Sequence, residues 1–136
     1  MSDLSRVSVS VIEGSVRLRL GIEPLILQPE DAGFWAQAFY YFGVVAEHGC
    51  LQPCEVGVIF NGKRSEVHFW PTPFGPPQEI ETWFCEERLT LTGGDLQAVG
   101  LSLWSAMQEA LRPPLPSELE VIGLVEEFLE IERRKQ

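Results

Sequence analysis

The stretch that decides the fold runs from residue 55 to residue 70 and reads EVGVIFNGKRSEVHFW. Apolar and polar residues alternate on both sides of Asn61-Gly62, and Asn-Gly between two such runs is the strongest short signal for a β-hairpin. A two-residue or four-residue loop gives both strands the same facing, whereas a three-residue loop would set Val58 against the outward side of its neighbour. The inner face of the hairpin then carries Val56, Val58, Phe60, Val67 and Phe69.

Two further hairpins follow from the same alternation. Residues 7–20 alternate around a turn at residues 13–15, and residues 79–92 alternate around a turn at Glu86-Glu87. The inward residues are Val7, Val9, Val11, Val16, Leu18 and Leu20 in the first hairpin, and Ile80, Thr82 and Phe84 in the second. The short apolar run at residues 25–27 is left without an assigned secondary structure.

Apolar residues at helical spacing indicate three helices. The first begins at Pro29 and extends to about His48, the second is capped by Asp95, and the third begins with a capping box from Ser117 to Glu120. The inward residues of the second helix are Leu96, Val99, Leu103, Met107 and Ala110, and those of the third are Leu119, Ile122, Val125, Phe128 and Leu129.

These elements occur in the order ββ, α, ββ, ββ, αα. Hairpins favour an antiparallel sheet whose one face is covered by helices. We therefore expect a single α+β domain over residues 1–136, with about six strands in three hairpins and the helices packed on one face. The proline-rich connector at residues 71–77 is too short to separate two domains.

Composition excludes several classes of protein. The net charge of −10 repels phosphate backbones, so we expect no nucleic-acid partner, whereas an acidic surface suits a basic protein. No apolar run approaches the roughly 20 residues of a membrane span, and the N-terminal residues do not read as a secretory signal. Three cysteines argue against a disulfide framework. We expect a cytoplasmic protein without a membrane partner.

Metal and catalytic chemistry have weak support in the sequence. His48, Cys50 and Cys54 lie within seven residues, and His68 with Cys85 could complete a zinc site. The Cys-x3-Cys spacing is loose, however, and nothing in the predicted topology brings the distant pair to Cys50. Buried free thiols with a surface histidine are therefore favoured, with no metal, no cofactor and no catalytic residue. A cysteine–histidine nucleophile pair lacks a local signature, which favours a protein that is not an enzyme.

The outward face of the two later hairpins is the most informative feature. If the inward faces of the two hairpins agree across the proline-rich connector, the alternation places two tryptophans among carboxylates. Aromatic rings amid acidic groups are typical of a site for a basic or mixed protein surface. The residues predicted to bind the partner are Glu66, His68, Trp70, Glu79, Glu81 and Trp83, with Glu55 adding a fourth carboxylate. The alternative is that the connector or the first hairpin covers both tryptophans.

The helix around residues 34–46 carries aromatic residues on more than one stripe. Such a helix is either buried on several sides or contacts another chain. The residues of a possible homodimer contact are Trp35, Phe39, Tyr40 and Tyr41.

Three functions remain open at this point. The leading one is a non-enzymatic protein-interaction module that neutralises a toxin or chaperones a secreted client. In size and charge the chain resembles small acidic bacterial immunity proteins and secretion chaperones, although the latter open with a helix and this chain opens with strands. The second is a small-molecule-binding domain or small enzyme with a pocket between the sheet and the aromatic helix. The third is a structural subunit of a homodimer or larger assembly.

Overall fold

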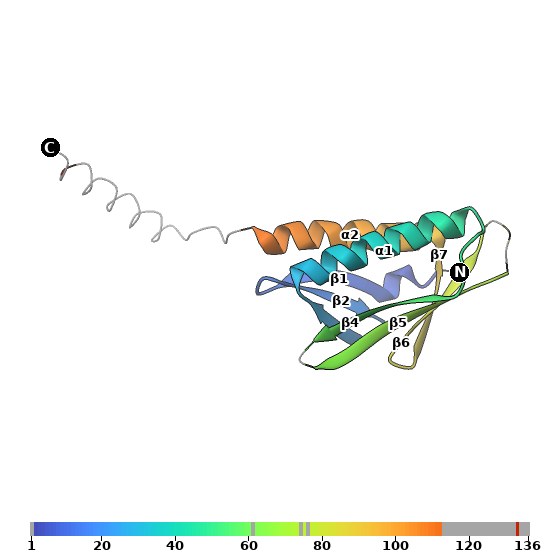
Figure 1. Ribbon diagram of the computed structural model, residues 1–136, viewed down its shortest axis with the longest axis horizontal. Helices are drawn as coiled ribbons and strands as arrows, with labels where there is room; N and C mark the ends of the chain where they lie inside the picture. The colour runs from blue at the N-terminus through green and yellow to red at the C-terminus, as the bar shows by residue number, and fades with distance from the viewer. Residues whose placement is uncertain (1, 61, 74, 76, 113–132, 134–136) are drawn as a thin grey trace.

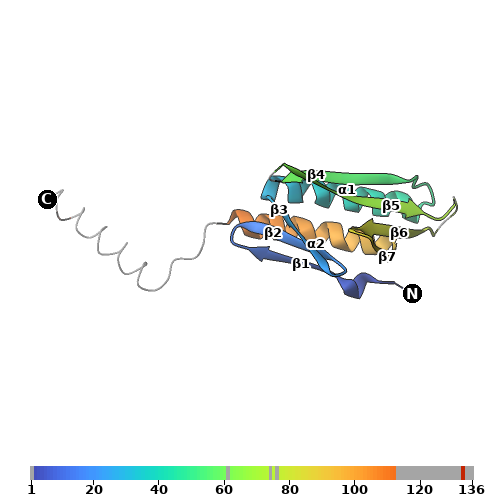
Figure 2. The same cartoon turned by 90° about the horizontal axis from the view of Figure 1, so that it is seen from below.

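Two helices form one layer of the protein, and antiparallel strands form the layer beneath them (Figure 1). The computed structural model describes residues 2–60, 62–73, 75, 77–112 and 133. Seen from below in Figure 2, the strands lie in two groups side by side against the helices. The predicted third helix, from Ser117 onward, lies outside the described residues.

The first sheet has three strands in the order β1-β2-β3. They are β1 (Val7–Ile12), β2 (Ser15–Leu20) and β3 (Glu23–Leu27), preceded by a short 3-10 helix η1 (Leu4–Arg6). The predicted first hairpin is confirmed: Val16, Leu18 and Leu20 are buried, and the three valines of β1 are partly buried against the same core. The apolar run at residues 25–27 belongs to β3, which pairs with β2 after a turn at Gly21, where φ is +82°.

The second sheet has four strands in the order β4-β5-β6-β7. They are β4 (Cys54–Phe60), β5 (Lys63–Pro71), β6 (Glu79–Phe84) and β7 (Glu87–Thr92). Phe60 pairs with Lys63, so the hairpin has the two-residue loop that keeps the predicted facing. The predicted inward residues that are buried here are Val56, Val58, Val67, Phe69, Ile80, Thr82 and Phe84. The structure does not describe the side chain of Phe60, the remaining predicted inward residue of this sheet.

The α+β class and the antiparallel hairpins are confirmed, but the single sheet of about six strands is wrong. The described residues form seven strands in two sheets, because β3 continues the first hairpin into a three-stranded meander. Hydrogen bonds to β7 from the N-terminal residues and from the turn between β2 and β3 link the two sheets. The Asp3 amide donates to the Thr90 carbonyl at 2.9 Å, and the Ile22 amide donates to the Glu87 carboxylate at 2.7 Å.

Both helices cover the same side of the strands (Figure 1). They are α1 (Pro29–Glu47) and α2 (Gly93–Leu111). The sequence placed the cap of the second helix at Asp95, whereas the residue at the N-cap is Thr92. Asp95 completes a capping box, because its backbone amide donates to Thr92 Oγ1 at 3.1 Å while its carboxylate accepts from the Thr92 amide at 2.9 Å.

The two helices touch backbone to backbone at glycines. A Cβ atom on Gly100 would lie 2.7 Å from the Ala36 carbonyl oxygen and 2.8 Å from the Tyr40 nitrogen, and one on Gly93 would lie 2.6 Å from the Gly43 carbonyl oxygen. Real side chains essentially never approach backbone atoms this closely. The helices can therefore pack at this distance only because these positions lack side chains.

The inner face of α1 is aromatic and packs on the second sheet. The Phe39 ring lies 6.2 Å from the Trp35 ring and meets the Phe69 ring of β5 edge-on at 5.3 Å, and Phe42 contacts Phe69 at 5.4 Å. Trp35 and Phe39 are 1% and 0% exposed. The multi-sided aromatic pattern of this helix is thus explained in part by its burial between α2 and the strands.

We predict that Gly100→Ala lowers the free energy of unfolding by about 2 kcal/mol, because the added methyl group pushes α2 away from the α1 backbone. This loss occurs although alanine favours a helix over glycine by about 1 kcal/mol. Chemical denaturation measures the effect. The matched control is Gly94→Ala in the same helix, where the nearest atom is 3.5 Å away, so its stability stays within about 1 kcal/mol of the parent. Equal effects of the two substitutions would contradict the close packing.

We also predict that Glu86→Gly stabilises the protein. The turn between β6 and β7 holds Cys85 at φ +48° and Glu86 at φ +67°, a left-handed conformation that side chains with a Cβ atom disfavour. Glycine at the second position should raise the free energy of unfolding by about 0.5–1 kcal/mol. Glu86→Ala removes the same carboxylate but keeps the Cβ atom, so in a thermal melt it should give no such gain.

Candidate functional site

The outer face of the second sheet points away from both helices (Figure 1). The strand register brings the predicted partner-binding residues together on it: His68 lies opposite Glu55 on one side and Trp83 on the other, and Trp70 lies opposite Glu81. We refer to this surface as the acidic aromatic face and define it by Glu55, Glu66, His68, Trp70, Glu79, Glu81 and Trp83. Inward residues of β5 pair with inward residues of β6. The inward faces of the two hairpins therefore agree across the connector, as the prediction of this surface requires.

The two tryptophans of this face differ in exposure. Trp70 is 52% exposed, so neither the connector nor the first hairpin covers it. Trp83 is half-buried, and its indole Nε1 donates to the Glu81 carboxylate at 3.4 Å. Arg88 Nη1 lies 3.5 Å from the other oxygen of Glu81. Glu81 therefore lies beside the exposed ring of Trp70, the half-buried ring of Trp83 and the guanidinium of Arg88.

A second cluster surrounds His68. Its Nδ1 atom lies 3.3 Å from the Glu55 carboxylate and its Nε2 atom 3.1 Å from the Glu66 carboxylate, so that a doubly protonated imidazole could donate to both. Arg64 pairs with the same two groups, through Nε to Glu66 and through Nη2 to Glu55 at 3.8 Å. Gly57 lies opposite Glu66, and the side chains of Glu66 and Arg64 pass over it.

The ligand atoms of Glu55, Glu66 and His68 lie within 4.8 Å of one another, the one such group among the described residues. Carboxylates and imidazole suit a divalent cation. The geometry does not favour one, because Arg64 already neutralises both carboxylates and the two imidazole nitrogens face different acids. We assign no metal here.

The residues that the sequence offered for a zinc site do not lie together in the structure. His48 and Cys50 are exposed just beyond α1, Cys54 is half-buried at the start of β4, and Cys85 is exposed in the turn after β6. None of these four residues belongs to the described group of neighbouring ligand atoms. All three cysteines are free thiols, but the prediction that they are buried is wrong for Cys50 and Cys85, which are exposed.

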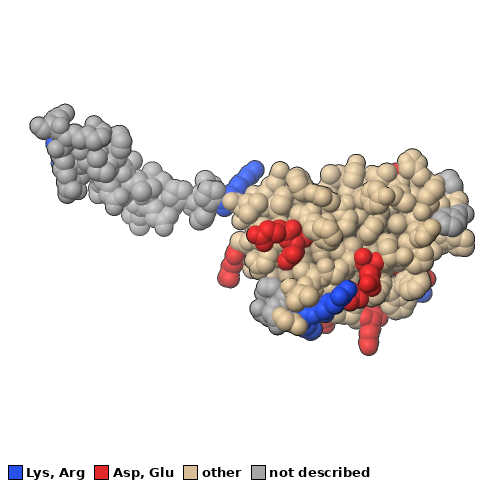
Figure 3. Space-filling model, viewed as in Figure 1, with Lys and Arg blue, Asp and Glu red and all other residues tan. Residues whose placement is uncertain are grey.

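Charge is distributed unevenly over the molecule. In the view of Figure 3, most of the surface over the helix layer carries no charged side chain, whereas acidic and basic side chains gather over the strands and the start of α1. On the acidic aromatic face, four carboxylates stand against Arg64 and Arg88, both of which are in ion pairs. The strand surface is thus the more charged layer and the helix surface the more apolar one.

The residues predicted for a homodimer contact separate into two groups. Trp35 and Phe39 lie in the core, so they offer no surface to a second chain, because they pack on α2 and β5 rather than facing solvent. Tyr40 and Tyr41 are exposed on α1. The structure therefore leaves only the two tyrosines accessible.

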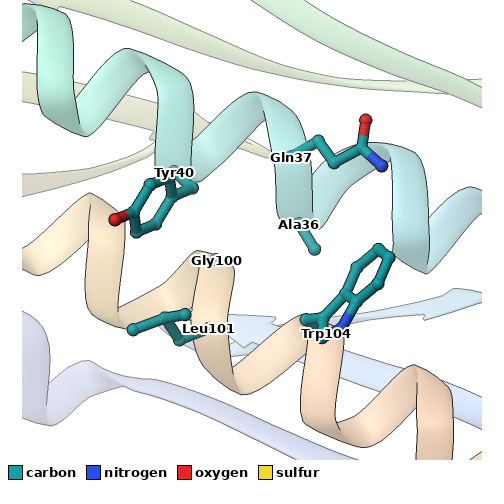
Figure 4. A pocket seen from close by; sticks show the side chains of 6 residues that line it. All are labelled: Ala36, Gln37, Tyr40, Gly100, Leu101 and Trp104. Atoms are coloured by element: carbon teal, nitrogen blue, oxygen red, sulfur yellow. The ribbon is translucent and has the colours of Figure 1, made fainter.

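A shallow apolar groove of about 300 Å³ lies between the two helices. Figure 4 shows Trp104 of α2 reaching toward α1 beside Ala36, and Tyr40 turned toward α2 above Leu101, with Gly100 between them. Leu101 and Trp104 are not among the candidate site residues predicted from the sequence. The signal was present, since residues 101, 104 and 111 form a second apolar stripe at helical spacing beside the inward one.

A further groove of about 360 Å³ lies where α1 meets the edge strand β4. Phe34, Ala38 and Phe42 of the helix and Val56 and Val58 of the strand contribute its apolar walls. The groove lies between the aromatic helix and the sheet edge. The aromatic residues on which the predicted pocket rested, Trp35, Phe39, Tyr40 and Tyr41 near His48, do not line it.

Comparison with protein-family models, with curated proteins and with solved structures finds no match to this chain. Among the described residues, no helix combines the length and apolar character needed to cross a membrane. The function must therefore be argued from the geometry of the surfaces described above.

The thiols should differ in reactivity. Burial raises the pKa of the Cys54 thiol from its ordinary value of 9.0 to about 11, so at neutral pH its reactive thiolate is about a hundredfold scarcer than at the ordinary value. We expect iodoacetamide to label the exposed Cys50 and Cys85 first and the half-buried Cys54 more slowly, as measured by mass spectrometry of the folded protein. Labelling of Cys54 at the rate of Cys50 would contradict this.

Proposed function

We propose that this protein is a non-enzymatic interaction module that binds a basic or mixed protein surface through the acidic aromatic face. The proposal rests on one observation: Trp70, 52% exposed, stands on a sheet face that neither helix covers, directly opposite the carboxylate of Glu81. A large aromatic ring loses favourable burial when it stays in water, and a flat aromatic platform with acidic neighbours suits a cationic partner.

The neighbours of Trp70 favour a basic partner. Strand pairing places Glu81 beside it, and Glu79 is exposed two residues earlier on the same face of β6. Among the residues that the structure describes, no cation pairs with Glu79, so this carboxylate is available to an incoming lysine or arginine. The net charge of −10 adds long-range attraction for such a partner, which accelerates association at low salt.

The arginines of the face contribute to selectivity. Arg64 and Arg88 each contact carboxylates of the same surface, which holds those acids in place. A basic partner that displaced Arg88 from Glu81 would exchange one ion pair for another, whereas an acidic partner would meet four carboxylates. Neutralisation of a toxin and chaperoning of a secreted client are the two concrete forms of this function.

The experiment compares capture of partners from host lysate by the tagged parent and by Trp70→Ala, followed by direct titration of the captured protein. We expect one stoichiometric, basic partner whose affinity for Trp70→Ala falls at least about 30-fold, the loss typical of a central aromatic contact. Glu81→Lys should weaken binding and reduce its salt dependence, because it reverses a charge that attracts the partner.

The matched control is Tyr41→Ala, which removes an aromatic ring of comparable exposure from the helix layer. Binding by this variant should equal that of the parent. Trp83 is less useful as a first substitution, because it is half-buried and its loss would also disturb packing. An equal loss of affinity in Trp70→Ala and Tyr41→Ala, or a partner that prefers the lysine variant, would contradict the proposal.

A small-molecule-binding domain is the second candidate, and the groove between α1 and β4 is the observation that favours it. Its floor is apolar, and Glu55 and Arg64 at its rim could hold a polar group of a ligand. A parent protein that captures no partner but gains thermal stability with one metabolite would favour this function. Light scattering of the same preparation tests the third candidate, a subunit that exists only as a dimer.

A further inference from the structure

The outer surface of α2 carries an apolar stripe that no described element covers. Leu101 is 59% exposed, Trp104 is 40% exposed and Leu111 is 62% exposed. These positions share one face of the helix, because residues three and seven apart along a helix lie above one another. The stripe forms one wall of the groove between the helices and continues to the last residue of α2.

The floor of this groove follows from the glycine contact. Gly100 and Ala36 have little or no side chain, so the close contact of the two helices forms the floor of the groove between Tyr40 and Trp104 (Figure 4). The walls are almost entirely apolar, and in Figure 3 the surface over the helices is largely free of charge. Such a groove accommodates the apolar side of a third helix.

The chain itself supplies a segment with that pattern, directly after α2. Residues 117–132 begin with a capping box and place apolar residues at helical spacing, with glutamates between them. Their apolar residues include Leu119, Ile122, Val125, Phe128 and Leu129. A polar helix side flanking an apolar stripe requires a surface to bury that stripe, because an isolated helix of about this length is marginal in water.

We propose that residues 117–132 dock as a third helix in the groove between α1 and α2 of the same molecule. The connection permits it: Arg112 has extended backbone angles, φ −69° and ψ 137°, and prolines at positions 113, 114 and 116 prevent α2 from continuing. A connection of about five residues is ordinary between antiparallel helices. The proposal requires the chain to turn back after Arg112, at the end of the exposed stripe.

The lengths also agree. A helix over residues 117–132 is about 24 Å long at 1.5 Å per residue, and Leu111 lies about 15 Å along α2 from Leu101. The returning helix therefore passes Leu111, Trp104 and Leu101 in turn. A tethered segment has an effective concentration on the order of millimolar, which exceeds that of any second copy at ordinary protein concentrations. The intramolecular segment is for this reason the occupant of the groove.

The test is hydrogen–deuterium exchange of the full chain, with light scattering of the same sample. In a monomeric parent, amides of residues 119–131 should exchange at least about tenfold more slowly than in a synthetic peptide of residues 113–136. Leu101→Glu places a charge on the groove wall and should return these amides to the peptide rate, while amides of α2 and the strands keep their protection. The matched control is Ile22→Glu, which charges an exposed apolar residue in the turn between β2 and β3 and should change nothing in residues 119–131.

Three outcomes overturn the proposal. The first is exchange of residues 119–131 at the peptide rate in the parent. The second is slow exchange that Leu101→Glu leaves unaltered, since the groove would then not be the docking surface. The third is protection that disappears on dilution together with a dimer, which would assign the groove to a second copy. Loss of α2 protection in Leu101→Glu would be resolved by the milder Leu101→Ser, for which the same expectations hold.

Discussion

The backbone contact between α1 and α2 is the constraint on which the rest of this structure depends. Gly43 meets Gly93, and Gly100 meets the backbone around Ala36, so the two helices form one thin layer. Because both helices are committed to the same side of the strands, the aromatic inner face of α1 closes the core there and the opposite sheet face stays open. The same absence of side chains creates the floor of the groove on the outer side.

This arrangement produces two surfaces of opposite chemistry. The strand layer presents carboxylates and two tryptophans, which strand pairing brings together around Glu81 and His68. The helix layer presents exposed aromatic and aliphatic residues with little charge. A charged aromatic surface suits reversible recognition of a basic protein, whereas an apolar groove suits a permanent occupant. The two proposals therefore use separate surfaces and can be tested independently.

The strands and their facing were predictable because their information is local. The alternation of apolar and polar residues around Asn-Gly determines which residues of β4 and β5 share a face. The observed two-residue loop confirms the predicted facing. The composition of the acidic aromatic face followed from the same rule. The short strand β3 was not predictable, because the three-residue apolar run at residues 25–27 becomes part of a strand only when β2 offers it hydrogen bonds. The division into two sheets likewise depends on contacts between segments distant in the chain.

The sequence by itself determined the class of the fold, the three hairpins, two helices and the outward position of Trp70, because periodicity and turn chemistry act over a few residues. Only the tertiary structure decided which aromatic residues of α1 are buried, since Trp35 and Phe39 lie in the core while Tyr40 and Tyr41 of the same helix are exposed. It also decided that Arg64 joins the carboxylates of the sheet face and that Leu101 and Trp104 border a groove. Those features depend on distances between separate elements, which no local pattern encodes.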